Sequence, residues 1–125
     1  MATLAEQEGA AFEEIEINFR ETVQPSAGVR VTNHYFLPGT ITKVMFSFPP
    51  GTNALVDARL EKDGHGFYPV RGHLALDNAT PVYHTSAGYY AKEPLTFEVR
   101  NRDGINPHTI TCTVVVRFQR PRWWR

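Results

Sequence analysis

Residues 109–118 read Thr-Ile-Thr-Cys-Thr-Val-Val-Val-Arg-Phe, and apolar side chains recur at every second position. One row of this alternation contains Ile110, Cys112, Val114, Val116 and Phe118. The other row is mostly polar, so the pattern predicts a β-strand with one buried face. The only cysteine of the chain lies in the apolar row. It cannot form an internal disulfide and is expected to be a small buried hydrophobe.

The segment before this strand alternates in the same way. Leu95, Phe97 and Val99 share one face, and the connection 101–107 is rich in residues that form turns. Two alternating runs joined by such a loop predict an antiparallel hairpin between residues 95–100 and 109–118.

The earlier part of the chain shows the same rhythm less regularly. Strands are expected near residues 14–20, 29–36, 44–48, 56–60, 67–70 and 80–85. The connections are too short for crossover helices, which excludes a parallel α/β sheet. We therefore predict an all-β, antiparallel two-sheet β-sandwich, of which the jelly roll is one form, with a small closed barrel as the alternative. Only residues 2–12 have the composition of a helix, and Gly9 weakens it.

Length and composition bound the class of protein. The 125 residues are 42% hydrophobic and 21% charged, as in one folded domain with its own core. The formal net charge is zero, which makes nucleic acid an unexpected partner. No apolar run is long enough for a membrane span, and the first residues do not resemble a signal peptide. The expected location is the cytoplasm, or the virion if the source is a virus.

The two ends of the chain carry opposite charge. Residues 1–16 contain five acids and no base, whereas residues 117–125 contain four arginines, two tryptophans and no acid. We divide the chain into an acidic N-terminal arm (1–12), a β-sandwich domain (13–118) and a C-terminal Arg/Trp tail (119–125). Such ends are expected of a subunit that docks on partners, either as a homo-oligomer or in a larger protein assembly.

The Arg/Trp tail is the main candidate for partner binding. Pro121 ends the last strand, because proline cannot donate a hydrogen bond to a ladder. Tryptophan and arginine are the residue types most enriched at binding hot spots. The candidate residues are Arg120, Arg122, Trp123, Trp124 and Arg125. Three destinations stay open: a neighbouring subunit, the chain's own sheet edge, or nucleic acid or lipid headgroups.

Glu13, Glu14 and Glu16 are the candidate electrostatic partners of that tail. Their charges repel one another unless they are neutralised, and the tail of a second copy offers arginines. We therefore expect arms that exchange between subunits, with the tryptophans supplying most of the affinity.

No catalytic or metal-binding signature is present. The five histidines lack ligand spacing, although His65 and His73 with Asp77 could converge across a hairpin. The cysteine is expected to be buried, where a thiolate is costly, and no serine lies in a nucleophile elbow. Asp57 and Glu61 are spaced like the solvated face of a strand. We predict a non-enzymatic protein without a metal or cofactor.

A second class of function rests on tyrosines. Tyr68, Tyr83, Tyr89 and Tyr90 lie in or near expected loops. Sugar-binding sandwiches stack such rings on pyranose faces, although ring packing at the sandwich edge explains each residue equally well. Tyr89 and Tyr90 are expected to be the most exposed pair. A carbohydrate-binding module is the alternative function.

Several phrases within about residues 41–118 consist of turn and strand-end residues. They are Phe48-Pro49-Pro50-Gly51, Asn53-Ala54-Leu55-Val56, Tyr68-Pro69, Leu76-Asp77-Asn78-Ala79-Thr80, Val99-Arg100-Asn101-Arg102-Asp103 and Asn106-Pro107-His108-Thr109-Ile110. In these phrases the chain resembles small β-sandwich accessory proteins of tailed phages and related viruses, which serve as decoration, spike-base or tail components. The resemblance implies a structural subunit of a virion, on a capsid or tail. The two arms match nothing in that family.

Overall fold

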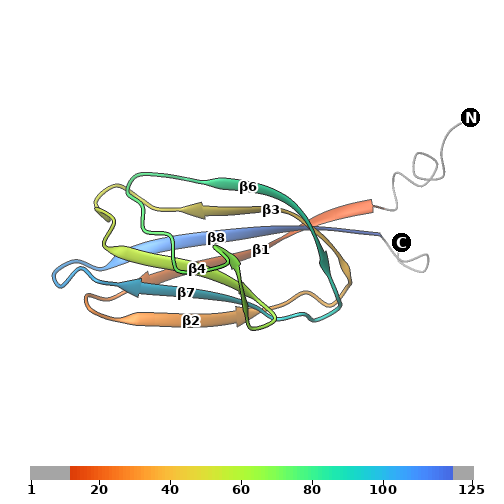
Figure 1. Ribbon diagram of the computed structural model, residues 1–125, viewed down its shortest axis with the longest axis horizontal. Helices are drawn as coiled ribbons and strands as arrows, with labels where there is room; N and C mark the ends of the chain where they lie inside the picture. The colour runs from red at the N-terminus through yellow and green to blue at the C-terminus, as the bar shows by residue number, and fades with distance from the viewer. Residues whose placement is uncertain (1–11, 120–125) are drawn as a thin grey trace, which may run out of the picture.

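The computed structural model describes residues 12–119, which form eight β-strands (Figure 1). They are β1 (Phe12–Val23), β2 (Gly28–Asn33), β3 (Gly39–Ser47), β4 (Val56–Lys62), β5 (His65–Tyr68), β6 (Val82–Tyr89), β7 (Leu95–Asn101) and β8 (His108–Gln119). Each strand expected from the sequence overlaps one of these. Within the described part, no helix has the length and apolar character needed to cross a membrane. Apart from Phe12 and Gln119, the two arms lie outside the described residues, and so does the helix expected at residues 2–12.

The strands form two antiparallel sheets of four strands each. One sheet has the order β1-β8-β3-β6 and the other has the order β2-β7-β4-β5. The antiparallel pairs β1–β8, β2–β7, β3–β6 and β4–β5 are nested along the sequence, which is the strand arrangement of a jelly roll. The predicted two-sheet sandwich is confirmed, and it takes the jelly-roll form.

The core lies between the sheets and is built from alternate residues of both. Phe97 on β7 is fully buried, with its ring centroid 5.6 Å from that of Phe19 and 6.4 Å from that of Phe46. Phe19 on β1 and Phe46 on β3 belong to the opposite sheet, so the three rings join the two layers. Cys112 is buried in the same core, and its burial raises the pKa of the thiol.

The predicted hairpin between residues 95–100 and 109–118 is wrong. These segments are β7 and β8, and they belong to different sheets: β7 pairs with β2 and β4, whereas β8 pairs with β1 and β3. The connection between them is therefore an arch from one sheet to the other. A hairpin and an arch both direct one row of each strand into the core, so alternation alone does not distinguish them.

Buried polar side chains hold this arch in place. The side-chain amide of Asn101 donates to the carbonyl oxygens of Val23 at 3.1 Å and Asn106 at 2.9 Å. The Asp103 carboxylate accepts backbone hydrogen bonds within the arch and lies 2.9 Å from Nε2 of His108. These bonds satisfy backbone polar groups at the point where the chain changes sheets.

The arch predicts a loss of stability in acid. The hydrogen bond with His108, followed by the backbone N–H of Ile105, lowers the pKa of Asp103 from 3.8 to about 2. Because the folded pKa is the lower one, the stability contributed by Asp103 is present above about pH 4 and is lost as the pH falls through about 2. Urea unfolding of Asp103→Asn should therefore show a smaller loss of stability across this window than the parent chain. The control Asp63→Asn, in an exposed turn, should keep the parental loss; an equal loss in Asp103→Asn would contradict this role.

Candidate functional site

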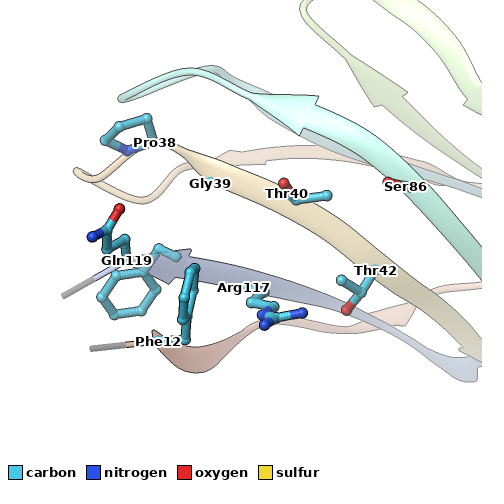
Figure 2. Close-up of a pocket in the computed structure, with 9 residues that line it drawn as sticks. Phe12, Pro38, Gly39, Thr40, Thr42, Ser86, Arg117 and Gln119 are labelled. Atoms are coloured by element: carbon cyan, nitrogen blue, oxygen red, sulfur yellow. The ribbon is translucent and has the colours of Figure 1, made fainter. Parts of the chain in front are cut away.

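The first residue of β1 and the last residue of β8 lie at the same end of the sandwich, beside a pocket. Phe12, the first residue of β1, is paired with Gln119, the last residue of β8, and the two strand ends lie together in Figure 1. The pocket has a volume of about 560 Å³ and is lined from β1, β3, β6, β8 and the segment before β3 (Figure 2). Its lining residues are Phe12, Pro38, Gly39, Thr40, Thr42, Ser86, Arg117, Phe118 and Gln119.

The course of β3 shapes one wall of this pocket. Gly39 lets β3 approach β8 closely, because a Cβ atom at this position would lie 2.4 Å from the carbonyl oxygen of Arg117. The register of β3 against β8 then shifts between Ile41 and Lys43. Bulges of this kind redirect side chains, and Thr42, within the shift, lines the pocket.

Arg117 is the one charged residue in the pocket lining. Its guanidinium carbon lies 4.7 Å from the centroid of the Phe12 ring, which is a cation–π contact. In the two ladders Arg117 is opposite Glu14 on β1 and Thr40 on β3. A second hollow of about 420 Å³ is lined by Phe12, Glu13, Glu14 and Arg117. At this end of the sandwich the stacked pair of Arg117 and Phe12 therefore lies between two hollows. One is lined by the hydroxyl groups of threonine and serine, and the other by the carboxylates of glutamate.

The structure brings together two of the three predicted glutamates. Glu14 and Glu16 are exposed, and the alternation of β1 places both on the face opposite the core. Among residues 12–119, no hydrogen bond or ion pair involves either of them. Glu13 is in the other row, where its charge, after burial, contributes to a raised pKa of Tyr35. The alternation around Ile15 and Ile17 could have separated Glu13 from the other two in advance.

The predicted tail residues fall in the undescribed segment. They are Arg120, Arg122, Trp123, Trp124 and Arg125, and they follow directly on Gln119 at the rim of the pocket. The residues that build the pocket were not predicted from the sequence. Arg117 offered a signal, since it is the single charge in its row of β8, but the partner Phe12 and the wall of β3 depend on strand pairing.

Two of the four candidate sugar-binding tyrosines stack on each other. The rings of Tyr68 and Tyr83 have centroids 4.9 Å apart and planes inclined by 23°. Tyr68 also contacts Phe67, and Tyr83 contacts Phe46 edge-on in the core. These rings are half-buried and pack against the core cluster, so their facing surfaces are not available to a ligand.

The expectation that Tyr89 and Tyr90 are exposed together is wrong for Tyr89. Its side chain is buried, and its hydroxyl donates to the carbonyl oxygen of Glu93 at 2.8 Å and accepts from the backbone N–H of Tyr35 at 2.7 Å. Tyr89 completes the inward row of β6, which the sequence interpretation ended too early. Tyr90 is exposed, and a hydrogen bond to Asp63 raises the pKa of its hydroxyl to about 12.

The polar clusters of the described residues are ion pairs and hydrogen bonds. No group of three or more His, Cys, Asp or Glu side chains within residues 12–119 is placed to hold a metal ion. Nε2 of His73 lies 2.8 Å from a carboxylate oxygen of Glu98 on β7. The expectation of a solvated strand face at Asp57 and Glu61 is wrong, because both carboxylates form ion pairs with arginines. Glu61 pairs with Arg30 on β2 and with Arg59 on β4 itself, and Asp57 pairs with Arg102 in the arch.

The fold and this end of the molecule define a small jelly-roll domain with a candidate docking site. No family model and no curated protein matches the sequence. Solved structures with a similar fold include FLHE, with a TM-score of 0.53 and 16% identity over 87% of this chain and 98% of that one. A mitogen derived from Yersinia pseudotuberculosis has a TM-score of 0.51 and 9% identity over 87% of this chain and 92% of its own.

A third similar structure is PliG of Aeromonas hydrophila, a periplasmic inhibitor of g-type lysozyme. It has a TM-score of 0.45 and 7% identity over 82% of this chain and 86% of that chain. At these identities the first two structures show a shared fold. They support the resemblance to small β-sandwich proteins, while none of the three is a phage decoration protein by its description.

Proposed function

We propose that this chain is a non-enzymatic structural subunit that assembles with further copies of itself, and that it docks through its terminal segments. The observation that carries the proposal is the position of the pocket. It lies at the start of β1 and the end of β8. Glu14 lines the adjoining hollow and Glu16 is in the same exposed row of β1, and neither carboxylate has a partner among the described residues.

The chemistry of the Arg/Trp tail is complementary to this site. A tryptophan side chain can enter the pocket and stack on the Arg117–Phe12 pair, since indole is the ring that cations favour most. The arginines of the tail can pair with Glu14 and Glu16. Six extended residues reach roughly 20 Å beyond Gln119, which is enough to enter the site of an adjacent copy. A head-to-tail contact of this kind closes into a ring or continues as a lattice.

The role on a particle rests on the sequence resemblance to phage accessory proteins. Jelly rolls occur in viral capsids and in lectins, so the fold is compatible with a decoration or accessory protein of a virion without selecting that role. The carbohydrate-binding alternative has less support. Tyr68 and Tyr83 occupy each other's faces and Tyr89 is buried, so the four rings do not form one platform.

The carboxylates provide the first test of the proposal. The double variant Glu14→Gln, Glu16→Gln should raise the dissociation constant of self-association about three- to tenfold, because each exposed ion pair contributes up to about 1 kcal/mol. Added salt should weaken the parent more than the variant. Sedimentation equilibrium at micromolar concentrations measures both effects.

A matched control removes two charges elsewhere. Glu21→Gln together with Asp63→Asn changes the net charge equally, away from the pocket, and should assemble like the parent. Assembly of the Glu14, Glu16 variant with parental affinity and salt dependence would show that these carboxylates do not bind the tail.

A further inference from the structure

The outer face of the β2–β7–β4 sheet carries a continuous network of ion pairs. Four arginines face three carboxylates and a histidine: Arg30, Arg59, Arg100, Arg102, Asp57, Glu61, Glu98 and His73. This face lies on the opposite side of the sandwich from the exposed row of β1 and β8. It is therefore separate from the proposed docking site.

Each carboxylate of the network already receives two contacts from other side-chain groups. Glu98 contacts Arg30 and His73, and Glu61 contacts Arg30 at 2.7 Å with Arg59 at 3.6 Å. Asp57 accepts two hydrogen bonds from the guanidinium group of a third arginine, Arg102, at 3.0 and 3.1 Å.

Among the arginines of this network, Arg100 has the longest distance to its nearest carboxylate. Its nearest carboxylate oxygen, on Asp57, is 3.9 Å away, and its hydrogen bond is to Nδ1 of His73 at 3.3 Å. This bond requires the His73 tautomer with hydrogen on Nε2, which the contact of Nε2 with Glu98 also favours. The Arg100 side chain is 56% exposed, so most of its donors face solvent.

A pocket of about 450 Å³ lies beside Arg100. It is lined by Gly28, Val29, Arg30, Glu98 and Arg100. Gly28 is directly opposite Arg100 in the β2–β7 ladder, and a Cβ atom there would lie 3.3 Å from Cγ of Arg100. A side chain at position 28 would therefore fill part of this pocket.

The register places a second arginine diagonally across this space. Arg30 is opposite Glu98, two residues from Arg100 along β7, so the two arginines start roughly 7–8 Å apart on one face. Guanidinium groups at that separation can converge on one group with two or more acceptor oxygens. The negative charge of Glu98 is paired with Arg30, and Glu98 also accepts a hydrogen bond from Nε2 of His73, which leaves Arg100 to attract an anion.

We infer that this pocket binds an oxyanion, such as a carboxylate, sulfate or phosphate group, between Arg100 and Arg30. Arg100 supplies the principal contact, because Arg30 is already shared between Glu61 and Glu98. Gly28 provides the room, and His73 orients Arg100 through its Nδ1 atom.

Amide chemical shifts test this inference directly. Sodium sulfate, sodium phosphate and sodium glucuronate should each be titrated against sodium chloride of equal ionic strength. We expect saturable shifts at residues 28–30 and 98–100 with at least one of the three oxyanions. The oxyanion that binds most tightly shows whether the pocket prefers a tetrahedral group, as in sulfate and phosphate, or a planar group, as in the carboxylate of glucuronate. Saturation by none of them would overturn the inference.

Three variants separate the site from general charge effects. Arg100→Gln should weaken binding at least about tenfold, since it removes a charged hydrogen-bond donor. Gly28→Ala keeps every charge, narrows the pocket and should weaken binding several-fold. Arg20→Gln removes an exposed arginine from β1 in the other sheet and should bind like the parent. Parental affinity in Arg100→Gln, or an equal loss in Arg20→Gln, would contradict the site, and thermal unfolding checks that all three variants fold.

Discussion

Replacing Phe97 with alanine should lower the free energy of unfolding by about 3–5 kcal/mol, the range measured for large aromatic deletions in packed cores. Phe97 is fully buried on β7, and its ring contacts Phe19 and Phe46 of the opposite sheet. Its removal takes away the contacts that join the two layers and leaves a cavity. The surrounding strands cannot fill that cavity, because each is held in register by a neighbouring strand.

Urea denaturation followed by circular dichroism measures this loss. Phe36→Ala is the matched control, because the Phe36 side chain is 54% exposed and its truncation should cost less than about 1 kcal/mol. Equal, small losses in both variants would mean that the two sheets do not pack through Phe97.

The strands could be predicted from the sequence, whereas their pairing could not. Alternation in residues 109–118 predicted β8 and its inward row, because period two follows from the geometry of one strand. The pairing of β8 depends on residues far away in the chain: Gln119 is 107 positions from its partner Phe12 on β1, and Arg117 is 77 positions from its partner Thr40 on β3. It also depends on the buried hydrogen bonds of Asn101 that hold the arch. Turn residues in 101–107 are equally suited to a hairpin, so the local sequence favoured the wrong connection.

The candidate site shows the same division. The polarity of the two ends was visible in the composition, and it led to Glu13, Glu14, Glu16 and the tail, although Glu13 is in the other row of β1. The pocket was not visible in the composition. It forms only where Gly39 and the register shift at Thr42 on β3 come together with Phe12 on β1 and Arg117 on β8. The position of Tyr89 was predicted wrongly, since only the full length of β6 shows that it belongs to the inward row.

Removal of residues 120–125 should abolish self-association. The truncated chain keeps all nine pocket-lining residues and the whole of β8 as described, so the sandwich should remain folded. It loses both tryptophans and all three arginines of residues 120–125, which the proposal places in the site of a neighbouring copy. Circular dichroism and the urea midpoint should match those of the full chain, which separates a loss of docking from a loss of folding.

Mass in solution, measured by sedimentation velocity on the full chain and on the chain ending at Gln119, tests the central claim most directly. We predict that the full chain sediments as an oligomer whose mass is a multiple of 14.2 kDa, and that the truncated chain sediments as a single copy. A full chain that is monomeric at high micromolar concentration would contradict docking between copies. So would a truncated chain that forms the same oligomer.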